Sequence, residues 1–274
     1  MAHVLIATDM SANALHAAVH AIRLFGVEGD RFTLLNAYQA PPTVPDQPIP
    51  VADLTAQIST EGLQAFAKDL LEALPDPSPE FAMVSAYGTV DNVVRSMIED
   101  GQGPDIVAMG TKSLTGTERL LMGSTTAAMI RSGLLPVLAV PSEARYEEPR
   151  RIVLADDGGP VERASLHILL DIARWSRSEV MIVHVVDEDD VDGTEVPMEG
   201  FDKHLGAIPH TYHSVSGEDV MVALNDLADQ SGAHLAVVIH RQRGLIDRLF
   251  HHSVATDLAL HTHIPLLVLQ HGKE

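Results

Sequence analysis

HVLIATD, residues 3–9, decides the fold, because the same pattern returns as RIVLADD at residues 151–157. Each copy is an apolar run that ends in aspartate, which is typical of a buried parallel strand followed by a loop. The next apolar run repeats at the same offset of 148 residues, with LLNAY at 34–38 matching IVHVV at 182–186. A repeat on this scale predicts two copies of one domain.

The later part of each copy repeats at a shorter offset of 129 residues, with DIVAMG at 105–110 matching HLAVVI at 234–239. The two offsets, 148 against 129, differ by 19, so the first copy carries about nineteen extra residues between its second strand and Gly88. We expect these residues to include the proline-rich stretch 41–50 and much of a long helix. The predicted domains are residues 1–142 and 150–274.

Strand-like and helix-like segments alternate within the first copy. We expect strands at residues 3–8, 32–38, 81–87, 105–109 and 136–140, and helices at 13–25, 52–74, 90–100 and 125–132. Solid apolar strands that alternate with helices indicate a parallel sheet covered on both faces. The predicted fold class is therefore α/β, with two tandem open α/β sandwich domains that each hold a five-stranded parallel sheet.

The composition excludes several classes of function. A formal net charge of −20 argues against nonspecific binding to DNA or RNA, which requires a basic surface. No apolar run is long enough to span a membrane, and the start MAHVLIATD lacks a signal-peptide pattern, so we expect a cytoplasmic protein. The absence of cysteine excludes disulfides, thiolate zinc sites and cysteine nucleophiles.

A glycine-bracketed segment, MGTKSLTGTERLLMGSTT at residues 109–126, carries the strongest functional signal. Gly110 and Gly123 lie near its ends, and Ser124 and Thr125 follow where a helix is expected to begin. Glycine lets backbone N–H groups approach a ligand without a Cβ in the way, and a helix N-terminus adds positive partial charge. The segment therefore predicts a phosphate-binding loop after the fourth strand.

The loops that should meet this segment follow the first and second strands. Ligands of open α/β sheets bind beyond the carboxyl ends of the strands, near the switch in strand order. Thr8 and Asp9 follow the first strand, and Ala37 lies at the end of the second. The place of the dinucleotide glycine signature holds TDMSAN, residues 8–13, so a site of the NAD or FAD type is not expected.

These motifs together resemble the universal stress protein family, over nearly the whole chain as a tandem pair of domains. The resemblance is carried by the aspartate after the first strand, the glycine pattern after the fourth and the ending PVLAVP. It implies a stress-response protein that binds ATP or ADP, with or without Mg²⁺, in its N-terminal domain. The site residues that it implies are Thr8, Asp9 and Ala37 at the adenine and ribose, Met109 and Gly110 along the ribose and α-phosphate, Ser113 in the loop, and Gly123, Ser124 and Thr125 at the outer phosphates.

The sequence departs from the family pattern at several positions. Ser113 stands where the second glycine is expected, and a serine lacks easy access to positive φ. In the second copy, the three glycine positions hold Ile239, Gln242 and His252, so we expect no ATP binding there by this route. A different anion site remains open in that segment, formed by Arg241, Arg243, His251 and His252.

No catalytic or metal site is predicted. The chain lacks a Gly-x-Ser-x-Gly elbow and a Walker A lysine pattern, so no nucleophile or base stands out. The histidines His251, His252, His261 and His263 cluster without the spacing of a zinc motif. The leading prediction is a nucleotide-dependent regulator or signalling module. The alternatives are an interaction or chaperone-like module that binds no nucleotide, or a slow ATPase.

The last strand of each copy, at residues 136–140 and 265–269, is expected to form a sheet edge. An open edge invites pairing. The family resemblance implies that the two domains pair through these strands within one chain. A homodimer of such chains is a further possibility that the sequence leaves open.

Overall fold

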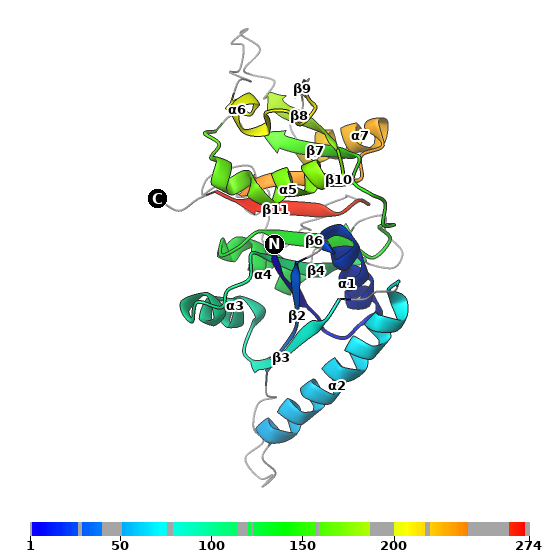
Figure 1. The fold of residues 1–274 in the computed structure, drawn as a ribbon, viewed down its shortest axis with the longest axis vertical. Helices are drawn as coiled ribbons and strands as arrows, with labels where there is room; N and C mark the ends of the chain where they lie inside the picture. Colours follow the sequence, from blue (N-terminus) through cyan, green and yellow to red (C-terminus); the bar gives the residue numbers. More distant parts are fainter. Residues whose placement is uncertain are drawn as a thin grey trace. The chain divides into compact units, whose positions relative to one another are not determined.

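The computed structural model describes residues 2–26, 29–39, 51–75, 79–113, 120–121, 123–156, 159–186, 200–216, 220–240 and 263–271. The chain divides into two compact units, one of residues 1–111 with 123–142 and the other of residues 112–122 with 143–274. Each unit is a layered α/β structure with a parallel sheet (Figure 1). None of the helices that the structure describes is long and apolar enough to cross a membrane.

The first unit is built from alternating strands and helices. Its sheet has the order β3-β2-β1-β4-β6, and every neighbouring pair is parallel. Helices α1 and α2 contact each other on one face, and α3 and α4 contact each other on the opposite face (Figure 1). The elements are β1 His3–Ala7, α1 Ala12–Phe25, β2 Arg31–Tyr38, α2 Val51–Ala73, β3 Phe81–Tyr87, α3 Val90–Glu99, β4 Ile106–Ser113, α4 Ser124–Ser132 and β6 Val137–Pro141. The last two residues of β4 and the short strand β5 Leu120–Leu121 are grouped with the second unit.

The second unit repeats this plan with the strand order β11-β10-β7-β8-β9, again with parallel neighbours. Its elements are β7 Arg151–Asp156, the 3-10 helix η1 Arg163–Leu166, α5 His167–Trp175, β8 Glu179–Val186, α6 Asp202–Leu205, β9 His210–Ser216, α7 Val220–Ser231, β10 Leu235–His240 and β11 Leu266–Gln270. The apolar residues of β1, β7 and β10 are buried in both sheets, as expected for parallel strands covered by helices.

The offsets of the sequence repeat are confirmed strand by strand. β8 lies 148 residues after β2, and β9 lies 129 residues after β3, with equal lengths in each pair. The extra residues of the first copy therefore fall between β2 and β3, the interval that contains the 23-residue helix α2. The corresponding interval of the second unit contains the four-residue α6. Residues 41–50 lie outside the described residues.

The predicted end of the fourth strand is wrong. β4 runs past Met109 and Gly110 to Ser113, and its last two residues pair antiparallel with β5, Lys112 with Leu121 and Ser113 with Leu120. Polar residues resemble a loop in the sequence, but here an antiparallel partner strand satisfies their backbone groups. Gly110 is thus a strand residue and does not begin a loop.

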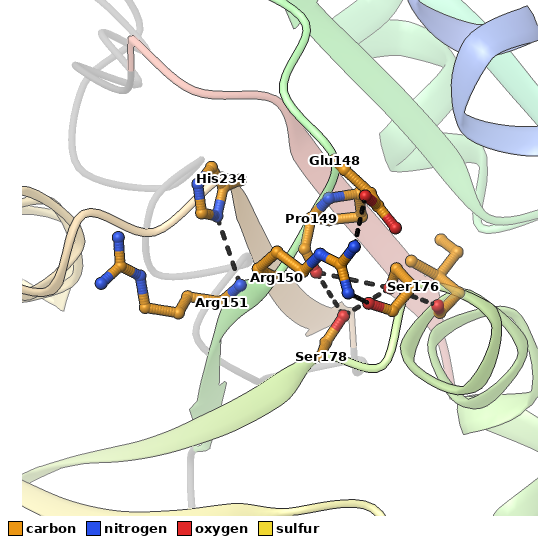
Figure 2. A network of polar contacts seen from close by, with 8 residues as sticks. Glu148, Pro149, Arg150, Arg151, Ser176, Ser178 and His234 are labelled. Carbon is orange, nitrogen blue, oxygen red and sulfur yellow. Dashed lines mark hydrogen bonds and ion pairs between the residues drawn. The ribbon is translucent and has the colours of Figure 1, made fainter.

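The segment before β7 is tied to the second unit by buried hydrogen bonds (Figure 2). The hydroxyl of Ser178 donates to the carbonyl of Pro149, and the hydroxyl of Ser176 lies 3.4 Å from the same carbonyl. The guanidinium of Arg150 donates to the carbonyl of Ser176 at 3.1 Å and pairs with Glu148 at 2.7 Å. These contacts fix where β7 enters its sheet.

Candidate functional site

The switch point of the first unit lies between β1 and β4. From β1 the sheet grows through β2 to β3 on one side, and through β4 to β6 on the other. The loop after β1 and the continuation of β4 toward α4 therefore leave the sheet at the same carboxyl edge, from neighbouring strands. Most of the predicted site residues belong to this edge.

The loop after β1 is held by its own side chains. Thr8 Oγ1 accepts a hydrogen bond from the N–H of Met10 at 2.8 Å, and Asp9 Oδ1 accepts one from the N–H of Ser11 at 3.1 Å. Met10 adopts a φ of +62°, a conformation that is strained for a residue with a side chain. The cap of α1 is Ser11, whose Oγ accepts from the N–H of Ala14. Asp9 is therefore an exposed loop carboxylate and not the helix cap.

The peptide group of Thr8 is fixed from β2. The N–H of Thr8 donates to the carbonyl of Leu35 at 2.8 Å, and the amide Nδ2 of Asn36 donates to the carbonyl of Thr8 at 2.7 Å. Sequence reasoning missed Asn36, although an amide inside the apolar run LLNAY was a visible signal. The predicted residue Ala37 is the next one along β2 and is half-buried.

Gly110 is explained by packing inside the protein. The amide Nδ2 of Asn13 donates to the carbonyl of Thr111 at 2.8 Å, and a Cβ at position 110 would lie 2.7 Å from that nitrogen. Thr126 of α4 donates to the carbonyl of Gly110 at 3.2 Å. Glycine therefore permits the close approach of α1 to β4. Met109 is buried in the core, so only its backbone can meet a ligand.

Gly123 has a different environment. It is the N-cap of α4, makes no side-chain cap, and no heavy atom of the described residues lies within 4 Å of a Cβ built on it. Ser124 and Thr125 are exposed in the first turn of this nine-residue helix. The first backbone N–H groups of a helix lack partners within the helix. Within the described part of the chain, this N-terminus thus lacks a side-chain cap and has open space beside it.

Part of the predicted loop, residues 114–119 and Met122, lies outside the described residues. Ser113 is placed by its backbone, which belongs to β4 and pairs with Leu120. Among the described non-glycine residues, only Met10 and Arg177 have positive φ. Serine at position 113 therefore carries no backbone strain in this conformation, and the glycine of the family pattern is not required there for its φ freedom.

The equivalent edge of the second unit carries ionisable side chains. The repeat places Asp156 at the position of Thr8 and His184 at the position of Asn36. His184 Nδ1 lies 3.6 Å from Asp156 Oδ2, and both side chains are largely buried. His240 Nδ1 lies 2.9 Å from Gln270 Oε1. Asp157, Arg241, Gln242, Arg243, His251 and His252 lie outside the described residues, so the alternative anion site stays a prediction.

Two other features lie away from the switch point. A cavity of about 840 Å³ at the amino edge of the first sheet is lined by residues of α1, β2 and β3, including Arg31, Phe32 and Phe81. It contains none of the predicted site residues. Among the described residues, no group of three or more histidine or acidic side chains could hold a metal ion. His263 pairs with Asp229 at 3.0 Å, and His261 is not described.

The chain was compared with family models, with known sequences and with solved structures, and the family matches and the structural matches agree. The model of the universal stress protein family matches residues 1–141 and again residues 148–270. A 108-residue stretch is 35% identical to the sensor protein KdpD of Mycobacterium tuberculosis, and it covers 39% of this chain but only 13% of that protein. A universal stress protein from Archaeoglobus fulgidus has a similar structure over 98% of both chains, with 17% identity and a TM-score of 0.74. A protein of unknown function from Pseudomonas aeruginosa matches over 98% of this chain and 92% of its own, with 16% identity and a TM-score of 0.60.

Proposed function

Because the chain belongs to the universal stress protein family, we propose that its first unit binds an adenine nucleotide, ATP or ADP, as a regulatory ligand in the cytoplasm. The observation that carries this proposal is the N-terminus of α4. Gly123 has open space beside it, although nothing in the described protein requires a glycine there. Phosphate is the ligand chemistry that an uncapped helix N-terminus preceded by glycine favours.

The other side of the switch point supplies a group for the sugar. Asp9 is exposed, and Oδ1 is the only one of its two carboxylate oxygens that accepts a hydrogen bond from the described residues. A carboxylate is an acceptor suited to the hydroxyls of ribose. The backbone N–H groups of Ser124 and Thr125 would then hold the phosphates of the nucleotide, with or without Mg²⁺. With Ala37 near the base, the nucleotide would lie across the edge between β2 and α4.

Calorimetric titration with ATP, ADP and AMP tests this proposal directly. We expect the intact protein to bind at least one of them, and Gly123→Val to weaken that binding by tenfold or more, because a branched side chain would fill the space beside α4 (~1.4 kcal/mol per tenfold). Gly200→Val is a matched control, since Gly200 also has no described heavy atom within 4 Å of a built Cβ. A wild-type protein that binds no adenine nucleotide would overturn the proposal and favour the interaction-module alternative. A turnover assay on the complex distinguishes binding from slow ATP hydrolysis.

We also propose that the two units pair within the chain through β6 and β11. Each of these strands ends the strand order of its own unit, and a sheet edge with free backbone groups invites pairing. A variant with Leu138→Pro and Val140→Lys in β6 should then speed hydrogen exchange of the β11 amides. Unchanged exchange in β11 would contradict the pairing. Sedimentation of the intact protein would show whether such chains also form a homodimer.

A further inference from the structure

A chain of hydrogen bonds links helix α2 to the loop after β1. Ser85 of β3 lies 2.7 Å from the hydroxyl of Ser59 in α2, and Ser59 donates to Asn36 Oδ1 at 2.6 Å. Asn36 Nδ2 then donates to the carbonyl of Thr8 at 2.7 Å. Ser59 and Asn36 are only 4% and 8% exposed. Hydrogen bonds in such dry surroundings are stronger than in water, and leaving one partner unsatisfied is costly.

The direction of every bond in this chain is fixed by chemistry. The Thr8 carbonyl can only accept, so the atom of Asn36 that faces it must be the NH₂ group. The carbonyl oxygen of the Asn36 amide then faces Ser59, which must donate its single hydroxyl hydrogen to it. Ser85 is left to donate to Ser59. The result is one directed chain that runs from Ser85 through Ser59 and Asn36 to Thr8.

The last bond of the chain orients the group that precedes Asp9. The carbonyl of Thr8 and the N–H of Asp9 belong to one planar peptide unit. A bond that fixes this oxygen therefore fixes the plane from which Asp9 departs. The next residue, Met10, is held at a φ of +62°, so the loop depends on neighbouring contacts to keep its shape.

Helix α2 touches the same loop at a second point. A Cβ built on Gly62 of α2 would overlap the sulfur of Met10. The glycine thus lets the side chain of the strained loop residue lie against the helix. Ser59 and Gly62 are three residues apart and so lie on neighbouring turns of one helix face. Two separate contacts, one polar and one apolar, therefore connect α2 to residues 8–10.

The described residues of the second unit do not repeat this arrangement. α2 lies in the interval where the first copy is nineteen residues longer, and the position of Asn36 is taken by His184, which faces Asp156. The hydrogen-bonded chain thus occurs in the unit that carries the exposed Asp9 and the open N-terminus of α4. Both units share one fold, but within the described residues this chain of hydrogen bonds is found only in the unit with the candidate nucleotide site.

We propose that Asn36 is a positioning residue of the nucleotide site and that it couples the docking of α2 to ligand binding. This inference rests on the proposed function. α2 holds Asn36, Asn36 holds the peptide plane before Asp9, and Asp9 meets the ligand. Because coupling between two equilibria is reciprocal, the bound nucleotide must also stabilise the docked position of α2. Binding of the nucleotide thereby changes the stability of α2, the long helix in the interval where the first copy has its extra residues.

The test uses the intact protein and variants at Ser59, which the proposed function does not place in contact with the nucleotide. We expect Ser59→Ala to weaken ATP binding roughly three- to tenfold, as the loss of one buried hydrogen bond predicts, and Ser59→Thr to restore it because it keeps the hydroxyl. Hydrogen exchange of the α2 amides should slow when ATP binds to the wild type. In Ser59→Ala, ATP should slow this exchange less.

Thr33→Val provides the matched control. Thr33 lies on β2, as Asn36 does, but toward the opposite edge of the sheet. The variant removes a buried hydrogen bond between His3 Nε2 and Thr33 Oγ1 at 2.8 Å. We expect it to lower the melting temperature and leave ATP affinity unchanged. Wild-type affinity in Ser59→Ala, or no effect of ATP on α2 exchange in the wild type, overturns the coupling alone. Failure of the wild type to bind any adenine nucleotide overturns the proposed function as well.

Discussion

His234 Nδ1 accepts a hydrogen bond from the backbone N–H of Arg151 at 3.2 Å, at the amino edge of the second sheet (Figure 2). The equivalent bond of the first unit runs from the N–H of His3 to Asp105 Oδ2 at 2.7 Å. The offsets of the repeat place Arg151 at the position of His3 and His234 at that of Asp105. The two units thus keep one contact between neighbouring strands while the accepting side chain differs.

This equivalence predicts that an aspartate can replace the histidine. His234→Ala leaves the N–H of Arg151 without its side-chain acceptor and should lower the free energy of unfolding by about 1 kcal/mol. His234→Asp should retain most of the stability, because a carboxylate accepts the same bond in the first unit. Denaturant unfolding of the three proteins measures this. Equal losses in both variants would show that the acceptor contributes nothing.

The two glycines of the candidate site should respond differently to the same change. In Gly110→Ala the new methyl group would press on the Asn13 amide, so we expect a loss of about 1–3 kcal/mol in the absence of any ligand. In Gly123→Ala the methyl group meets no described atom, so stability should change by less than about 1 kcal/mol.

The double variant Gly110→Ala with Asn13→Ala checks the cause. If the Asn13 amide is what the methyl group presses on, the two losses should not add, because the second change removes the first conflict. Additive losses in thermal or denaturant unfolding would assign the cost of Gly110→Ala to something else.

The sequence predicted the alternating elements because the strands that build each sheet are apolar runs that return in the same order in both copies. It did not predict that β4 extends to Ser113, since a polar strand end paired with a short partner resembles a loop. It also assigned both Gly110 and Gly123 to one phosphate-binding loop. Only three-dimensional packing separates a glycine that admits Asn13 from one that borders open space. The hydrogen bonds that link Ser85, Ser59 and Asn36 were not predicted for a similar reason, because the three residues are far apart in the sequence.

Because His20 is buried, we expect the free energy of unfolding to fall on mild acidification. Burial inside the first unit, helped by the neighbouring His16 and Arg23, lowers the pKa of His20 to about 4 from its ordinary 6.5. Above pH 6.5 the His20 side chain is mostly neutral in both the folded protein and the unfolded chain. Between pH 6.5 and about 4 the unfolded chain binds the proton and the folded protein does not, so the free energy of unfolding falls by about 3 kcal/mol in total. The test is denaturant unfolding from pH 7 to pH 4.

His20→Gln supplies the comparison for that measurement. The variant cannot titrate at this position, so its stability should decline less steeply over the same pH range. Parallel curves for the wild type and the variant would show that other groups cause the decline.

His210 should respond to pH in the opposite direction, because both of its ring nitrogens face acceptors. Nδ1 lies 2.8 Å from the carbonyl of Ile208, and Nε2 lies 2.7 Å from Asp202 Oδ1, which also accepts from the hydroxyl of Tyr212 at 2.8 Å. A neutral imidazole has only one N–H and cannot donate to both acceptors. The geometry therefore favours the charged ring, which can donate to both acceptors and so ties α6 to β9.

The hydrogen bonds among His210, Asp202 and Tyr212 shift the pKa values of His210 and Asp202 in opposite directions. The hydrogen bond to Ile208, followed by those to Asp202, raises the pKa of His210 above 6.5, and hydrogen bonds from His210 and Tyr212 lower the pKa of Asp202 below 3.8. The stabilisation from His210 is complete below pH 6.5 and is lost as pH rises through its raised pKa. The stabilisation from Asp202 is complete above pH 3.8 and is lost as pH falls through its lowered pKa. The attachment of α6 is strongest between these limits.

Hydrogen exchange of the α6 amides measures this attachment as a function of pH, after correction for the intrinsic exchange rate. We expect protection to be high near pH 5.5 and to fall as pH rises above the ordinary histidine value. His210→Gln should remove the pH dependence. His213→Gln is the matched control, since His213 lies on the same strand but, among the described residues, contacts Thr211 and no carboxylate. If protection in the wild type does not change across this range, the charged ring of His210 is not what holds α6 to β9.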